Sequence, residues 1–369
     1  MIRHFIWSAL IILFAGAQVH LHGQNQQFEI TPQSTTFIVA AAQGGFVVPH
    51  REQMRHLITR HTKGFTISYE KELNGSKYWH QAYQYPSLGF ELFVANLGNP
   101  SQMGNAFSGM SYILLPLNKS EQFKIYLKPG IGIGYLSKIY DRESNPKNFA
   151  IGSKINGTVM LESGCEILLT NRLKVIPGIR LTHFSNASFQ KPNLGYNVPS
   201  VFVAVKWAAR QGERIKKEIT PEKFSPHSFS VYGGFGVKEN FPPNSGKRMT
   251  YTLSSMLEKR ISFKSSLALG MDLFYNGGVE DPSAEIDEVT PVGKKILAGA
   301  FGGYSLHLHK FRIVMQAGLY IVDEYKRNGS LYNRFGLRYQ INEHLEAGLH
   351  LKTHLTVADH FELGLAYRF

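Results

Sequence analysis

The sequence predicts an all-β protein, an antiparallel transmembrane β-barrel of the outer membrane with about sixteen strands. Three observations support this: an export signal at the N-terminus, long segments in which apolar and polar residues alternate, and connections that are short at one end of the strands and long at the other. The composition agrees, because 12% of the 369 residues are aromatic and only 18% are charged. Such a mixture favours strands and excludes a disordered chain.

The first residues are typical of a secretory signal. Arg3 supplies a positive charge, residues 5–14 form an apolar stretch, and Ala15-Gly16-Ala17 is a cleavage site of small residues. We therefore predict a signal peptide over residues 1–17, with Gly23 as the latest cleavage site. The apolar stretch is too short to span a bilayer, and no cysteine directly follows it to carry a lipid anchor.

Strict alternation predicts strands that are apolar on one face. Odd positions over residues 123–135 are apolar and even positions are Lys, Tyr or Gly, and the pattern returns over residues 311–321, 335–341, 345–351 and 361–369. In a transmembrane barrel this apolar face meets lipid, whereas in a soluble sandwich it would point into the core. The last strand ends on Phe369, as the assembly signal of outer-membrane barrels does.

The predicted connections are of two kinds. Short links occur at 118–120, 170–171, 309–310 and 342–343, and long polar ones at 49–63, 138–147 and 276–294. Short periplasmic turns and long outer loops are typical of outer-membrane barrels. Two segments on the short-turn side, 73–86 and 208–226, do not follow this rule. Because the second could join two units, the sequence leaves open whether the strands form one ring.

The formal net charge of +13 favours an anionic partner, either nucleic acid or a phosphorylated lipid surface. The export signal and the lack of a nucleic-acid-binding motif argue against nucleic acid. A lipopolysaccharide leaflet fits better, and a basic protein with no specific use for its charge remains the alternative. The single cysteine, Cys165, cannot form an internal disulfide. We expect its side chain to be packed or to face lipid, as a small apolar residue would.

A polar cluster interrupts the apolar row that leads through Ile179 and Leu181. His183 and Ser185 continue this odd, lipid-side row, about 6.6–7 Å apart along a strand, so that a leaning imidazole can reach the serine hydroxyl. Asn197 begins the next alternating run on the same face. Polar groups on the lipid face cost least near the interface, which is where a strand end beside a loop would lie.

These residue types suit ester hydrolysis, which needs an activated hydroxyl, a base and donors for an oxyanion. Ser185 can be the nucleophile, His183 the base, and Asn197 the group that orients the imidazole. Asn186 could donate to the oxyanion through its backbone or its amide, and Asn193 would hold the loop. A His-x-Ser pair in a strand also arises by chance.

The cluster resembles a known family signature. The motif reads His183-x-Ser185-Asn186, followed by Pro192-Asn193-x-Gly195-x-Asn197. Over residues 146–207 it is similar to the lipid A 3-O-deacylase family, the PagL-type acyloxyacyl hydrolases. This resemblance implies an eight-stranded barrel with an outward His/Ser/Glu triad near the outer leaflet. Such an enzyme removes the acyl chain at position 3 of lipid A without metal or cofactor.

Carried onto this chain, the resemblance makes His183 the base, Ser185 the nucleophile, Asn186 the oxyanion donor and Asn193 a supporting residue. Two features depart from the family. Asn197 stands where the family has Glu, and an amide orients a histidine without adding charge. The chain is also about twice as long as eight strands require, and the family does not explain the additional strands.

We therefore expect a deacylase-like barrel unit over residues 24–208, a charged linker over 209–226 and C-terminal barrel strands over 227–369. The predicted activity is that of a carboxylic-ester hydrolase acting on lipid A in the bacterial outer membrane. No cofactor, metal or nucleic acid is expected, and the oligomeric state is left open. The alternatives are a passive channel or transporter with a basic lumen, and a structural barrel or receptor that binds through its long loops.

Two loop clusters have plainer interpretations. Asp281, Glu285, Asp287 and Glu288 could bind calcium, but their spacing matches no EF-hand loop, so solvated surface is favoured. Histidines 50, 56 and 61 in the first long loop could bind metal or phosphate. Without a Cys or carboxylate frame, they are expected to be ordinary polar loop residues.

Overall fold

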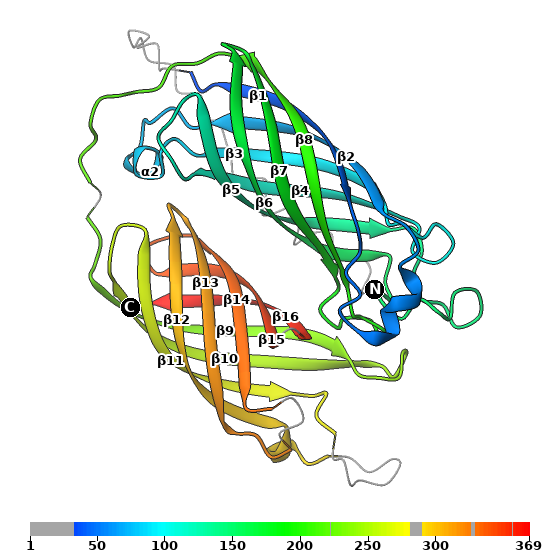
Figure 1. Ribbon diagram of the computed structural model, residues 1–369. Helices are drawn as coiled ribbons and strands as arrows, with labels where there is room; N and C mark the ends of the chain where they lie inside the picture. Colours follow the sequence, from blue (N-terminus) through cyan, green and yellow to red (C-terminus); the bar gives the residue numbers. More distant parts are fainter. Residues whose placement is uncertain (1–32, 222, 281–289, 326–328, 356) are drawn as a thin grey trace, which may run out of the picture. The chain divides into compact units, whose positions relative to one another are not determined.

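The computed structural model describes residues 33–221, 223–280, 290–325, 329–355 and 357–369. The predicted signal peptide and the acidic cluster from Asp281 to Glu288 lie outside these ranges. Sixteen strands form two closed antiparallel barrels of eight strands each, β1–β8 and β9–β16 (Figure 1). The predicted fold class and strand number are confirmed, and the strands close into two rings.

The first barrel contains β1 (Thr36–Gly45), β2 (Thr62–Glu72), β3 (Ser87–Asn96), β4 (Asn105–Pro116), β5 (Phe123–Leu136), β6 (Ile155–Thr170), β7 (Leu173–Ser185) and β8 (Tyr196–Arg210). Each strand pairs with the next, and β1 closes the ring against β8, with Ile38 opposite Trp207. The short helices η1 (Glu52–Leu57) and α2 (Tyr78–Ala82) lie in the connections that follow β1 and β2.

The second barrel contains β9 (His227–Glu239), β10 (Lys247–Arg260), β11 (Ser265–Asn276), β12 (Ile296–Leu308), β13 (Phe311–Val322), β14 (Leu331–Gln340), β15 (Leu345–His354) and β16 (Val357–Arg368). Here β16 closes against β9, with Leu363 opposite Phe235. The helix η2 (Val292–Lys295) precedes β12. Within the described ranges, no helix has both the length and the apolar character needed to cross a membrane.

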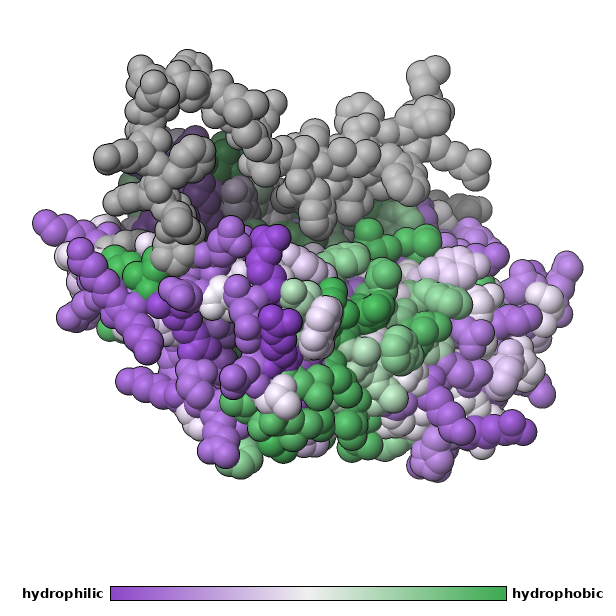
Figure 2. All heavy atoms as spheres, turned by 90° about the horizontal axis from the view of Figure 1, so that it is seen from above, coloured by the Kyte–Doolittle hydropathy of each residue, from purple (hydrophilic) through white to green (hydrophobic). Residues whose placement is uncertain are grey.

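The outer surface is apolar because one side chain in two points outward along every strand. Ile179 and Val201, on neighbouring strands, are 64% and 66% exposed, while Arg180 and Ser200 beside them are buried inside the barrel. Hydrophobic residues gather in a band with hydrophilic residues on both sides (Figure 2). This is the surface expected of a wall in contact with lipid.

Ion pairs and buried apolar side chains together fill the interior of the first barrel. Five cationic side chains pair with five carboxylates there: Lys124, Lys128, Lys174, Arg180 and Lys206 with Glu70, Glu72, Glu91, Glu162 and Glu166. Arg180, for example, lies 2.8 Å from Glu91 and 2.5 Å from Glu162. Buried charges of opposite sign satisfy one another in this way.

The second barrel repeats the arrangement with other residues. Its pairs join Lys238, Arg312, Arg334, Arg338 and Lys352 with Glu258, Asp272, Glu346, Asp359 and Glu362. Among the described residues, the lysine and arginine charges of each lumen are thus matched by carboxylates. The expectation of a basic lumen, on which the channel alternative depended, is therefore wrong. The sequence did not indicate this pairing, because the acidic partners come from strands far apart along the chain. The filled interiors also disfavour a water-filled passage.

The irregular connections on the short-turn side pack against the first barrel. Arg214, in the segment after β8, donates to both carboxylate oxygens of Glu72, at 2.8 and 3.0 Å. Gln81 of α2 donates to the carbonyls of Ile215 and Lys217, at 3.3 and 2.8 Å. The segment that follows β8 therefore lies against the turns of this barrel before β9 begins at His227.

Candidate active site

The polar cluster lies where β7 ends and β8 begins, at the end of the barrel that carries the long loops. His183 is paired directly opposite Asn197 in the β7–β8 register. Phe184, between His183 and Ser185, is fully buried in the barrel core, so alternation places its two neighbours on the row that contains Ile179 and Leu181. His183 is half-buried there, and Ser185 is buried, with 7% of its surface exposed. The structure thus has His183, Ser185 and Asn197 on the same side of their strands, as the alternation predicts.

A hydrogen bond joins the imidazole of His183 to the side chain of Asn197. The distance from His183 Nδ1 to Asn197 Oδ1 is 2.7 Å. Since an amide oxygen only accepts, His183 carries its proton on Nδ1 in this arrangement, and Nε2 is left with a lone pair. A histidine with a free Nε2 lone pair is a competent general base.

The hydroxyl of Ser185 contacts Asn193. Its Oγ lies 3.0 Å from Asn193 Nδ2 and 3.3 Å from Asn193 Oδ1, and it accepts from the backbone N–H of Ala187 at 3.1 Å. Among the described contacts, the Ser185 hydroxyl is therefore held by Asn193. The hydrogen bond between this hydroxyl and the His183 imidazole, which the sequence spacing allows, is not among them. Catalytic hydrogen bonds are often loose without substrate and tighten when it binds.

Asn186 holds the loop between β7 and β8. Its backbone N–H donates to Asn193 Oδ1 at 3.1 Å, and its side-chain Nδ2 donates to Ser153 Oγ at 2.6 Å and to the Gln190 carbonyl at 2.9 Å. These bonds occupy the backbone N–H and the side-chain amide of Asn186, the two groups that we expected to donate to an oxyanion. Asn193 Nδ2 is the amide donor at the serine hydroxyl. The amide nearest the serine hydroxyl is therefore that of Asn193, and the donors of Asn186 are used within the loop.

Two features of the backbone position Asn193 and the imidazole. A bridge pairs Asn193 with Ile151, and the N–H groups of Leu194 and Gly195 both donate to the Ala150 carbonyl at 2.9 Å. Gly195 has a φ of +79°, and a Cβ there would lie 2.8 Å from the Phe184 carbonyl oxygen and 3.0 Å from His183 Cε1. The motif glycine therefore lets the loop pass close against the imidazole.

One contact of the site was missed from the sequence. His50, in the segment after β1, lies with Nδ1 3.3 Å from Asn197 Nδ2 and Nε2 3.1 Å from the Leu194 carbonyl oxygen. In the sequence it resembles the other loop histidines, because it lies 147 residues from Asn197 and outside any alternating strand. His56 instead contacts the Lys147 carbonyl at 2.8 Å, and His61 the Gly45 carbonyl at 3.3 Å.

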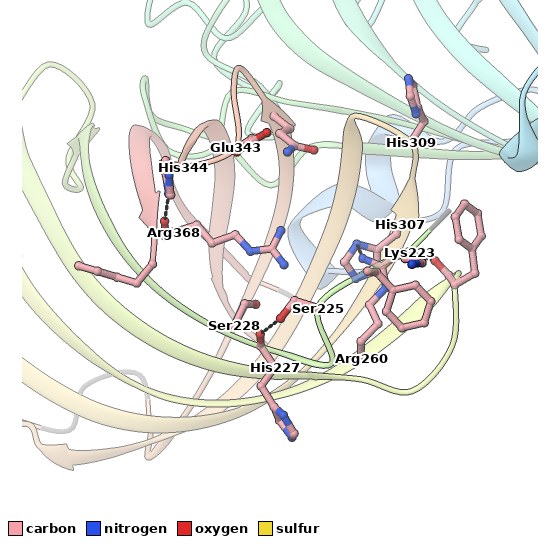
Figure 3. A pocket seen from close by; sticks show the side chains of 14 residues that line it. Lys223, Ser225, His227, Ser228, Arg260, His307, His309, Glu343, His344 and Arg368 are labelled. Carbon is pink, nitrogen blue, oxygen red and sulfur yellow. Dashed lines mark hydrogen bonds between the residues drawn. The ribbon is translucent and has the colours of Figure 1, made fainter. Parts of the chain in front are cut away.

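The second barrel carries a cavity of about 530 Å³ at its short-turn end (Figure 3). It is lined by basic residues that include Arg260, His307 and Arg368. Arg260 donates to the carbonyls of Ser262 and Phe263 and lies 2.9 Å from His307 Nδ1. None of the predicted site residues lines this cavity, and the guanidinium of Arg260 is engaged by the barrel itself.

Two family models match the chain. The lipid A 3-O-deacylase (PagL) model matches residues 63–206, and the model of the acyloxyacyl hydrolase C-terminal domain matches residues 227–369. Together they cover most of the first barrel and all of the second. The expectation that the family leaves the C-terminal strands unexplained is therefore wrong. No curated protein gives a significant match.

Several solved outer-membrane structures are similar to parts of the chain. Neisserial surface protein A is 13% identical over 47% of this chain and 96% of its own, with a TM-score of 0.33. The outer membrane enzyme PagL is 18% identical over 45% and 97%, with a TM-score of 0.30. Omp33 of Acinetobacter baumannii is 10% identical over 91% and 98%, with a TM-score of 0.17. At these values the likeness says nothing about function.

The lipid-facing walls, the closed rings of strands and the family matches define a β-barrel protein of the bacterial outer membrane. Within this class, the chain belongs to the PagL-type family of lipid A 3-O-deacylases and acyloxyacyl hydrolases.

Proposed function

We propose that the protein hydrolyses an ester-linked acyl chain of lipid A, at position 3, with a Ser/His/Asn site on the outer wall of its first barrel. The observation that carries this proposal is the 2.7 Å bond between His183 and Asn197, beside a serine on the same outward row. A half-buried base with a defined tautomer and a buried hydroxyl, 7% exposed, thus lie together at the edge of a wall that faces lipid.

The proposed reaction has two steps. Ser185 Oγ attacks the acyl carbonyl carbon while His183 Nε2 takes the hydroxyl proton, and the ester C–O bond then breaks as His183 returns the proton to the departing sugar oxygen. Water attacks the acyl-enzyme in the same manner and releases the fatty acid. Asn193 Nδ2, which lies 3.0 Å from Ser185 Oγ, donates to the carbonyl oxygen as it becomes negative.

Lipid A is favoured as substrate by the position and the charge of the site. The outer face of β7 and β8 is apolar up to His183, so that acyl chains can lie along it, and the polar residues begin at the loop end of the strands. The chain has a net charge of +13, and its luminal lysines and arginines are paired. The surplus therefore lies outside the lumens, where it can attract a phosphorylated leaflet.

The direct test is mass spectrometry of lipid A from a host with fully acylated lipid A that expresses the protein. The wild type should remove one hydroxyacyl chain, and Ser185→Ala should lower this activity on the order of 10⁴-fold or more. Ser255→Ala removes a serine from the outer wall of the second barrel and serves as the matched control, with full activity expected. Deacylation that survives Ser185→Ala would exclude the proposed site.

A further inference from the structure

We propose that His50 is a positioning residue that turns the side-chain amide of Asn197 so that its oxygen faces His183. This inference rests on the proposed function, because it concerns the orientation of the base in that site. It addresses the departure that most distinguishes this chain from its family, an amide at the position of the acid.

An amide must be oriented, whereas a carboxylate need not be. The two ends of the Asn197 side chain have nearly the same shape, but one accepts hydrogen bonds and the other donates them. If Nδ2 faced the imidazole, His183 Nδ1 would have to accept, and its proton would move to Nε2. The nitrogen needed to take the proton of Ser185 would then be blocked.

The contacts of His50 select the productive orientation. The Leu194 carbonyl, 3.1 Å from His50 Nε2, can only accept, so this nitrogen carries the proton of a neutral ring. Nδ1 of His50 then presents a lone pair to the Asn197 side chain at 3.3 Å, and only the amide Nδ2 can donate to it. With Nδ2 so directed, Oδ1 faces His183 Nδ1 at 2.7 Å. One backbone carbonyl thus fixes the tautomer of both histidines.

A competing contact exists but is weaker. The Val48 carbonyl oxygen lies 3.4 Å from His50 Nδ1 and would favour a proton on that nitrogen. The Leu194 carbonyl is nearer to its own nitrogen, and it can accept only if Nε2 is protonated. The shorter contact therefore favours the tautomer in which Nδ1 accepts from Asn197.

The backbone holds His50 beside Asn197 by extending the β1–β8 pairing beyond the strand. The N–H of Val48 donates to the Asn197 carbonyl at 2.9 Å, and the N–H of Phe46 donates to the Pro199 carbonyl at 3.2 Å. Val47 anchors this segment in the barrel core, where it is 1% exposed. The position of His50 is thus set by the fold of the first barrel and does not depend on its own side-chain contacts.

The test uses the full-length protein in detergent, with purified lipid A as substrate, and measures kcat and KM. His50→Leu should lower kcat about three- to tenfold, the effect of one net hydrogen bond, and change KM less than twofold. His50→Asn keeps an acceptor near the position of Nδ1 and should recover most of the lost activity. Heat-modifiable migration on gels checks that each variant is folded.

The decisive variant is Asn197→Asp, which has the same shape and two equivalent oxygens. In that background the orientation of residue 197 no longer matters, so adding His50→Leu should not lower kcat. If His50→Leu is as active as the wild type, or lowers kcat equally in both backgrounds, the positioning role is excluded while a Ser185-dependent deacylase remains. If the wild type shows no deacylation at all, the proposed function itself fails.

Discussion

The two barrels have the same architecture but different outer surfaces. Each is a closed ring of eight antiparallel strands with five cationic and five acidic side chains paired inside it. On the first barrel, the outward row of β7 ends in His183 and Ser185, and β8 begins with Asn197 on the same face. On the second, the outward row of β15 continues through Leu345, Ala347, Leu349 and Leu351.

This difference separates what maintains the fold from what provides chemistry. A barrel wall needs only apolar outward residues and satisfied inward ones, and both barrels meet that need. The polar cluster of the first barrel is a local exception, held by the loops around it. A site of this kind can therefore be gained or lost without a change in the number or pairing of strands.

Among the further substitutions, loss of the proposed base should have the largest effect, and it tests whether the polar cluster of the first barrel is catalytic. His183→Gln keeps a side chain of similar length but removes the imidazole, and deacylation should fall about 10²- to 10⁴-fold. His344→Gln, at a turn of the second barrel, should leave activity unchanged. Mass spectrometry of lipid A measures both activities. Equal losses of deacylation in the two variants would contradict a catalytic cluster on the first barrel alone.

Breaking a luminal ion pair tests whether the barrels depend on one another. Arg180→Met leaves the two carboxylates of Glu91 and Glu162 with Lys128 as their one shared cation. Arg334→Met removes the guanidinium that Asp272 and Glu362 share. Each should cost about 3–5 kcal/mol of unfolding free energy, because one buried carboxylate charge loses its compensating cation. Urea titrations followed by gel migration measure the stability.

These two substitutions should differ in their effect on activity. Arg180→Met should lower deacylation at temperatures that unfold the first barrel, whereas Arg334→Met should leave the initial rate of the folded enzyme unchanged. A loss of deacylation in folded Arg334→Met protein would mean that the second barrel contributes to the site.

The loop glycine of the site should have an intermediate effect. Gly195→Ala places a Cβ against the Phe184 carbonyl and the imidazole at a φ of +79°, so that about 1–3 kcal/mol of strain displaces the loop or the ring. The expected result is a fall in kcat of about tenfold or more. Gly302→Ala on the second barrel, where a Cβ would meet nothing within 4 Å, should leave kcat unchanged.

An exposed ion pair should have the smallest effect. Arg55 and Glu52 lie 3.4 Å apart in the first long loop, and both side chains are largely exposed. Arg55→Gln should change the unfolding free energy by less than about 1 kcal/mol, since solvent screens such a pair. A larger change in the urea midpoint would indicate that this loop supports the barrel and does more than surround the site.

The sequence predicts most of the fold, because alternation is a local property. The phase of residues 123–135, and that of His183, Ser185 and Asn197, can be counted along the chain. The closure into two rings cannot be derived from alternation, since it depends on pairs such as Ile38 and Trp207, whose strands are distant in sequence. For the same reason, the acidic partners of the luminal lysines and arginines were not foreseen.

The loop contacts of the site were also beyond the sequence. His50 lies outside the alternating strands, and nothing in its surroundings indicates that it contacts Asn197. Which amide lies against the Ser185 hydroxyl depends on the folded loop, where a bridge to Ile151 holds Asn193 in that place. Residue types indicated the chemistry, but the folded loops decide which atoms can take part in it.

The amide of Asn197 has a consequence for how the site meets the membrane. With neutral imidazoles, none of the four side chains His183, Ser185, Asn197 and His50 carries a formal charge in the resting state. A carboxylate at position 197 would need hydration or a counterion, and ionised groups on the lipid face become more costly with depth. In the proposed reaction, an uncharged set of side chains would let an ester just below the headgroups enter the site without drawing water down with it.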